Sequence, residues 1–263
     1  DDSFISSKGS DYIDGGSEID TLDYSNVDLG NGGNRVIIDL STNRALDDGY
    51  QTAGSAVVDY IYNIERIIGT SGDDKVYGDS ANNTLEGGAG KDTLEGNNGD
   101  DSLVGGTGDD IIDGGAGEDK IYGGDDNDTI YDGAGVDSLL GEAGNDTFYA
   151  GSGNDIITGG DGIDLLSYAL SESLITATLG SGESSDFGSV VSATEGTDSL
   201  KDHIEIIKGS NYSDTLTGWS GTAVNGVVYD DTLYGEGGND IISGGLGADT
   251  LYGGEGNDTF RGQ

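Results

Sequence analysis

Residues Gly87-Gly88-Ala89-Gly90-Lys91-Asp92-Thr93-Leu94-Glu95 form one unit of a nine-residue repeat, and eleven such units run without a gap from residue 69 to residue 167. Positions one and four are each Gly in nine of the eleven units. The exceptions are Asp132 and Ala150 at position one and Ala81 and Asp126 at position four. Position eight is always apolar: Val76, Leu85, Leu94, Leu103, Ile112, Ile121, Ile130, Leu139, Phe148, Ile157 and Leu166. A fixed period of this kind is typical of a solenoid.

Each unit combines a turn with a short strand. The first six residues of most units contain two or three glycines, which take the positive φ angles of tight turns without a Cβ penalty. The last three residues place an apolar side chain between two mostly polar ones, so position eight points inward and positions seven and nine point outward. Two units then complete one flattened coil of eighteen residues. We therefore predict an all-β fold in which such coils stack as a parallel β-helix.

The repeat resembles the RTX, or haemolysin-type, calcium-binding nonapeptide repeats, because four positions agree over eleven units. The resemblance implies a parallel β-roll with calcium-binding turns rich in Gly and Asp. It also implies that each Ca²⁺ ion lies between successive turns on one edge, held by position-six carboxylates and turn carbonyls. Such ligands suit Ca²⁺, which takes about six to eight oxygens in flexible geometry, better than Mg²⁺, which prefers a tight octahedron.

Position six supplies the candidate metal ligands. Because one coil holds two units, alternate units align their position-six side chains in two ladders, one on each edge of the roll. One ladder would contain Asp74, Asp92, Asp110, Asp128, Asp146 and Asp164, and the other Asn83, Asp101, Asp119, Asp137 and Asp155. Carboxylates about 4.8 Å apart repel one another by roughly 1 kcal/mol in water and by about 3 to 4 kcal/mol near a protein surface. We therefore expect several calcium ions between them.

Two residues depart from the repeat, and each leads to a separate prediction. Asn83 offers a neutral ligand close to Ala81, where position four lacks its glycine, and should mark a weak or empty site. Asp126 also replaces the glycine of position four and is expected either to distort its turn or to add a ligand.

The remaining chain alternates between repeats and spacers. We divide it into a short repeat pair at 1–23, a spacer at 24–68, the main block at 69–167, a second spacer at 168–208 and a C-terminal block at 209–263 with an insertion at 222–229. Position six in the two outer blocks is occupied by Asp11, Asp20, Asp214, Asp231, Asp240, Asp249 and Asp258, which we also predict to bind calcium. Both spacers contain longer β-prone runs, such as Val36-Ile37-Ile38-Asp39-Leu40, and end on Ile64-Glu65-Arg66-Ile67-Ile68 or Ile204-Glu205-Ile206-Ile207. We expect them to form wider coils that continue the stack.

Composition narrows the classes of function. The 263 residues include 51 acidic and 10 basic side chains, for a net charge of −41, which argues against nucleic acid and anionic lipid surfaces as partners. The chain contains no cysteine, so disulfides and thiolate metal sites are excluded, and no apolar run is long enough to span a bilayer. The single histidine, His203, is predicted to be an ordinary strand residue, and no catalytic constellation is visible. We expect the protein not to be an enzyme.

These features predict a role outside the cell. The chain begins at Asp1 without a signal peptide and ends within a repeat, so we interpret it as part of a longer protein. Together with the missing cysteines, the resemblance implies a substrate of one-step (type I) bacterial secretion. Only one buried side chain per nine residues opposes the entropy of ordering a glycine-rich backbone, so we expect the chain to fold only when it binds calcium.

The most probable role by this argument is an extracellular structural module that serves as a stalk, scaffold or surface-layer element. Two alternatives remain open. One is a subunit that assembles into calcium-stabilised filaments or sheets, since the outward position nine carries apolar residues such as Val104, Tyr122 and Leu140 that could contact another copy or a neighbouring surface protein. The other is an accessory module of an adhesin or of a secreted enzyme, similar to those of epimerases and proteases.

Overall fold

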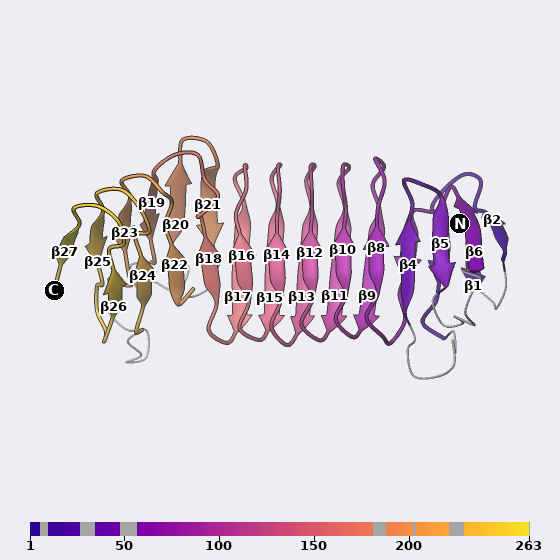
Figure 1. Ribbon diagram of the computed structural model, residues 1–263, viewed down its shortest axis with the longest axis horizontal. Coiled ribbons are helices and arrows are strands. Elements are labelled where there is room, and N and C mark those ends of the chain that lie inside the picture. Colours follow the sequence, from indigo (N-terminus) through magenta and orange to yellow (C-terminus); the bar gives the residue numbers. More distant parts are fainter. Residues whose placement is uncertain are drawn as a thin grey trace. The chain divides into compact units, whose positions relative to one another are not determined.

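The computed structural model describes residues 1–5, 10–26, 35–47, 57–180, 188–201, 204–220 and 229–262. These residues form two compact units, Asp1–Thr129 and Ile130–Gln263, and strand β14 (Thr129–Tyr131) crosses the boundary between them in the sequence. All regular structure in the described ranges is β-strand (Figure 1). Accordingly, these ranges contain no helix that is long and apolar enough to cross a membrane.

The first unit, Asp1–Thr129, is built from two sheets. Its strands are β1 (Ser3–Ile5), β2 (Tyr12–Asp14), β3 (Thr21–Asp23), β4 (Val36–Asp39), β5 (Arg44–Asp47), β6 (Val57–Tyr62), β7 (Arg66–Ile68), β8 (Lys75–Tyr77), β9 (Thr84–Ala89), β10 (Thr93–Glu95), β11 (Ser102–Thr107), β12 (Ile111–Asp113) and β13 (Lys120–Asp125). One sheet has the order β1-β3-β7-β9-β11-β13 and the other β2-β6-β5-β4-β8-β10-β12. From β7 onward, successive strands therefore alternate between the sheets.

The second unit, Ile130–Gln263, repeats this arrangement. Its strands are β15 (Ser138–Ala143), β16 (Thr147–Tyr149), β17 (Ile156–Asp161), β18 (Leu165–Ser167), β19 (Ile175–Thr178), β20 (Ser189–Ser192), β21 (Gly196–Leu200), β22 (Ile206–Lys208), β23 (Thr215–Thr217), β24 (Thr232–Tyr234), β25 (Ile241–Ser243), β26 (Thr250–Tyr252) and β27 (Thr259–Arg261). One sheet has the order β15-β17-β21-β20-β19-β23-β25-β27 and the other contains β16-β18-β22-β24-β26.

The register confirms the predicted eighteen-residue coil. Leu94 pairs with Ile112 in the parallel neighbours β10 and β12, and Leu103 pairs with Ile121 in β11 and β13. In the second unit, Leu139 pairs with Ile157 in β15 and β17. Each pair is separated by two nine-residue units, so one coil contributes one strand to each sheet and the fold is an all-β parallel β-roll.

In each unit the core is a column of position-eight side chains. Every position-eight residue from Val76 to Leu166 is at most 1% exposed, which confirms the predicted inward direction. The neighbouring residues behave differently, because Ile111 at position seven is 49% exposed while Ile112 at position eight is 0% exposed. Outward position nine also forms contacts along the roll, since the rings of Tyr131 and Tyr149 stack with centroids 4.6 Å apart.

The turns depend on residues with positive φ. In the unit that starts at Gly87, Gly88 and Gly90 have φ angles of 113° and 121°. Asp126, which replaces the position-four glycine, takes the same left-handed conformation with φ of 79°, and its side chain is exposed. Asp126 therefore keeps the turn and places its carboxylate in solvent.

The spacers differ from the expected wider coils. Strands β4, β5 and β6 form an antiparallel meander in the first unit, as do β19, β20 and β21 in the second. Tight polar turns cause the reversal: Oδ1 of Asp39 accepts hydrogen bonds from Oγ of Ser41 (2.6 Å) and the backbone N–H of Thr42 (3.1 Å). The outer strands of each meander nevertheless pair in parallel with the roll, through β4 with β8 and β21 with β17.

Several sequence expectations concern residues beyond the described ranges. His203 and residues 222–228 of the insertion are among them. The last residue of the insertion, Tyr229, is described and packs edge-on against the buried Trp219, with ring centroids 5.0 Å apart.

Truncation of the core column should destabilise the roll much more than truncation of its outer face. We expect Ile112→Ala to lower the free energy of unfolding by about 2 to 4 kcal/mol, because it leaves a cavity between stacked coils. Ile111→Ala, at the adjacent exposed position, should change it by only about 0.5 kcal/mol. Urea unfolding in saturating calcium measures both variants, and equal destabilisation would contradict the assignment of position eight to the core.

Candidate metal centre

The predicted position-six ligands are mostly buried at the edges of the roll. Of the eighteen predicted ligands, only Asp11, Asp249 and Asp258 are not fully buried, and all three lie in the outer blocks of repeats. The buried ones are Asp20, Asp74, Asn83, Asp92, Asp101, Asp110, Asp119, Asp128, Asp137, Asp146, Asp155, Asp164, Asp214, Asp231 and Asp240. A turn aspartate serving only as a solvated polar group would face water, so this burial requires a compensating partner.

At most ladder corners, one carboxylate oxygen accepts a hydrogen bond from the preceding coil. The backbone N–H of Asp74 donates to Oδ1 of Asp92 (2.7 Å), and the N–H of Asp92 donates to Oδ1 of Asp110 (2.7 Å). The same bond joins Asp101 to Asp119 (2.8 Å) and, in the second unit, Asp137 to Asp155 (2.9 Å). The structure thus brings the predicted ladders together and fixes the orientation of each carboxylate.

The second oxygen lacks this compensation at many corners. Within the described residues, no hydrogen-bond donor reaches the buried Oδ2 atoms of Asp20, Asp92, Asp101, Asp110, Asp155 and Asp240. A Cβ added at Gly87 would collide with Oδ2 of Asp92, and it would also lie 2.7 Å from the carbonyl oxygen of Gly105 on the next coil. Carboxylate and carbonyl oxygens therefore converge beside position one, and such a donor set fits a hard cation such as Ca²⁺.

Burial makes the ladder carboxylates reluctant to ionise without a cation. Desolvation raises the pKa of Asp92 to about 8, and the charges of Asp110 and Asp74 add to the effect. Desolvation likewise raises the pKa of Asp101 to about 7 and that of Asp110 to about 6, although each accepts a backbone hydrogen bond that favours its charged form. A bound cation would remove this penalty, because it stabilises the ionised carboxylates.

Comparison with known protein families agrees with this geometry. The family model described as the RTX calcium-binding nonapeptide repeat matches more than half of the chain, at residues 1–22, 62–94, 95–130, 131–166, 201–222 and 225–260. The chain belongs to the RTX calcium-binding repeat family. It is a calcium-binding repeat module, and its all-β parallel roll is the fold that these repeats form. No curated protein matches the chain.

Within the described residues, the chain itself closes at least four RTX corners. The backbone N–H of Thr70 donates to Oδ2 of Asp74 (2.5 Å), that of Ser210 to Oδ2 of Asp214 (2.7 Å), and that of Trp219 to Oδ2 of Asp231 (2.6 Å). At the fourth corner, the N–H of Asp79 donates to Oδ1 of Asn83 (2.9 Å). In each case the N–H comes from position two, which is not glycine. These corners satisfy a position-six oxygen with protein donors. Asn83 carries an amide in place of a carboxylate, and the weak or empty site expected there stays a prediction.

The spacers contribute RTX ladder residues that the sequence analysis missed. The N–H of Asp11 donates to Oδ1 of Asp59 (2.8 Å), and that of Asp20 donates to Oε2 of Glu65 (3.0 Å). In the second unit, Asp155 and Asp164 bond in the same way to Asp198 (3.0 Å) and Glu205 (2.8 Å). The sequence did contain a signal, because Glu65 and Glu205 each stand two residues before a buried isoleucine, as position six stands before position eight.

A further set of contacts between coils runs along position five, in addition to the two position-six ladders, and the sequence analysis also missed it. The N–H of Glu118 donates to Oδ1 of Asp100 (3.0 Å), and the N–H of Asn127 donates to Oδ1 of Asp109 (3.1 Å). Here the later coil donates to the earlier one, whereas at position six the earlier coil donates to the later. The sequence signal for this ladder was the enrichment of Asp and Asn at position five. The position-five side chains join successive coils at the exposed rim.

Removal of a buried ladder carboxylate should weaken calcium binding more than removal of a rim carboxylate. We expect Asp92→Asn to lower the calcium affinity of its corner by about tenfold or more, because the site loses a charged ligand. Asp100→Asn removes the same charge from an exposed position-five side chain and serves as the matched control. Calcium titration monitored by chelator competition compares them, and equal losses would mean that net charge, not the buried ladder, governs binding.

Calcium binding should depend on pH with a defined sign. Folding raises the pKa of Asp92 to about 8 and of Asp110 to about 6, above the ordinary value of 3.8, so the metal-free fold holds protons that the unfolded chain has released. The metal-free roll should therefore gain stability as pH falls through this range and lose it as pH rises. Calcium must displace these protons, so its apparent affinity should increase from pH 6 to pH 8. Calorimetry in buffers of different ionisation enthalpy measures the proton release, and its absence at pH 6.5 would contradict the assignment.

Proposed function

We propose that this protein is an extracellular structural module that folds when it meets calcium after secretion and then serves as a stalk, scaffold or surface-layer element. The observation that carries the proposal is the set of buried position-six carboxylates, most of which have one oxygen hydrogen-bonded to the neighbouring coil. At Asp92, Asp101 and Asp110 the other oxygen has no hydrogen-bond donor within the described residues. At neutral pH such a pattern favours a cation between the coils.

The architecture supports coupling between calcium and folding. Each eighteen-residue coil buries few large side chains other than its two position-eight residues, while it orders many glycines. Stacking also brings carboxylates together at both edges, where their mutual repulsion opposes the fold. Cation binding converts this repulsion into attraction, so the free energy of binding becomes free energy of folding.

The same chemistry supports a place outside the cell. Extracellular calcium modules bind at about 10⁻⁴ to 10⁻³ M, far above the free calcium of a cell interior. A chain that needs such concentrations would stay unfolded during synthesis and become ordered after export, which suits transport through a narrow channel. The net charge of −41 supports this proposal further, because an unneutralised chain of that charge resists collapse.

A calcium titration tests the proposed function directly. In a chelator at neutral pH we expect far-ultraviolet circular dichroism of a disordered chain, and in millimolar calcium that of a β-protein, whereas millimolar magnesium should not produce the change. The same β signal in chelator and in calcium would overturn the proposal. Electron microscopy of the calcium-bound protein separates dispersed particles, which the module predicts, from filaments or sheets, which would support the self-assembling alternative.

A further inference from the structure

One corner of the second unit differs from the rest of the repeat. Within the eleven-unit block only Asp132 and Ala150 replace the position-one glycine, and they stand eighteen residues apart, on successive coils of the same edge. At ordinary corners a Cβ at position one would collide with the position-six carboxylate of the same unit, as at Gly141 with Asp146 and at Gly159 with Asp164. The corner at Asp132 must therefore arrange its carboxylates differently.

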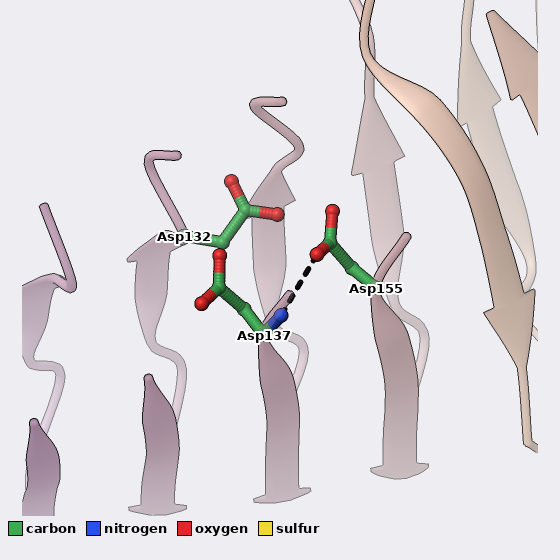
Figure 2. A group of neighbouring side chains, drawn as sticks. All are labelled: Asp132, Asp137 and Asp155. Carbon is green, nitrogen blue, oxygen red and sulfur yellow. Dashed lines mark hydrogen bonds between the residues drawn. The ribbon is translucent and has the colours of Figure 1, made fainter. Parts of the chain in front are cut away.

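The change brings three buried carboxylates together. Asp132 is 0% exposed, Asp137 2% and Asp155 1%, and one oxygen from each lies within 4.8 Å of the others. Figure 2 shows the three side chains approaching one another, Asp132 and Asp137 from the two ends of one turn and Asp155 from the next coil, with the backbone N–H of Asp137 bonded to Asp155. Asp137 and Asp155 belong to the position-six ladder, whereas Asp132 stands at a position that carries no side chain elsewhere in the block except at Ala150.

The polar contacts of Asp132 leave one oxygen for a ligand. Its Oδ1 accepts hydrogen bonds from the N–H groups of Gly133 (2.7 Å) and Gly151 (2.5 Å), which fix the carboxylate across two coils. Within the described residues no donor reaches Oδ2 of Asp132 or Oδ2 of Asp155, and both atoms are buried. A fully buried carboxylate that is held rigidly, with an uncompensated oxygen among two other carboxylates, points to a cation.

The surroundings add negative potential to the trio. The N–H of Asp155 donates to Oδ1 of the buried Asp198 (3.0 Å), and the hydroxyl of the buried Tyr168 donates to the other oxygen of Asp198. Burial raises the pKa of Asp132 well above its usual range, and the charges of Asp155 and Asp137 act in the same direction. A cation bound to the trio would compensate all three carboxylates at once.

We propose that Asp132, Asp137 and Asp155 bind one calcium ion through three carboxylates and form the tightest cation site among the described repeats. This inference rests on the proposed calcium-binding function and adds that the sites differ in their affinity for calcium. Affinity of oxygen-ligand sites for Ca²⁺ rises with the number of charged ligands. A site with three carboxylates should also prefer trivalent lanthanide ions more strongly than the ordinary corners do.

The test compares two variants at Asp132 with a matched control. Asp132→Asn removes the charge while keeping the shape, and Asp132→Gly restores the glycine of the repeat. Asp126→Gly also replaces an aspartate by the glycine of the repeat and removes one charge, but from an exposed side chain. Circular dichroism in saturating calcium establishes that each variant is folded.

Chelator competition with calcium, and terbium luminescence excited through nearby tyrosines such as Tyr131, measure the sites. The wild-type protein should retain one ion at chelator concentrations that remove the others, and both Asp132 variants should bind this ion about tenfold or more weakly. Asp126→Gly should retain it unchanged. A single class of equivalent wild-type sites, or unchanged binding in Asp132→Asn, would overturn this inference and leave the proposed function standing. Absence of any calcium binding by the wild-type protein would overturn both.

Discussion

The structure depends on a carboxylate that is buried between two coils. Oδ1 of Asp92 accepts a hydrogen bond from Asp74 on the preceding coil, and Asp92 repeats the contact with Asp110 on the following one. The bond holds each side chain inside the turn, where the carboxylate is almost inaccessible to water. A buried carboxylate in turn requires a positive charge beside it. The stacking of the coils and the binding of cations at their edges therefore depend on the same contact. The glycine at position one belongs to the same arrangement, because at ordinary corners such as Gly87 a Cβ would collide with the position-six carboxylate.

The spacers preserve the hydrogen bond between coils and buried carboxylates even though their strands reverse direction. Asp59 and Asp198 in the meanders, and Glu65 and Glu205 at their ends, receive the N–H groups that a position-six residue would receive. A spacer can therefore interrupt the nine-residue period without exposing the end of a ladder. The parallel outer strands of each meander supply both halves of this contact: one strand presents a carboxylate, such as Asp198, and the other presents a backbone N–H, such as that of Val36, which donates to Asp74.

The sequence predicted the periodic part of the molecule well because periodicity reflects a local repeat of burial. Leu94 and Asp92 could be assigned to the core and to the edge from one unit, and the eighteen-residue coil then followed. The antiparallel meanders could not be foreseen from β-prone runs such as Val36–Leu40, since a run of this kind fits a wider coil equally well and only the turn at Asp39 decides. The proximity of Asp132 to Asp155 could not be foreseen either, because it depends on how the corner is arranged where Asp132 and Ala150 replace the glycine of position one.

The self-closed corners at Thr70 and Ser210 have a consequence for how each roll becomes ordered. Each is the first corner after a spacer, and its position-six carboxylate is already satisfied by a backbone N–H from its own turn. Such a coil needs no ion to satisfy this carboxylate oxygen, so once calcium is present it can act as a seed for the next coil. Assembly would then advance from the seed toward the C-terminal side, one ion and one coil at a time. The two spacers would thus divide a long, highly charged chain into segments with separate starting points, so that an error in one segment need not spread to the other.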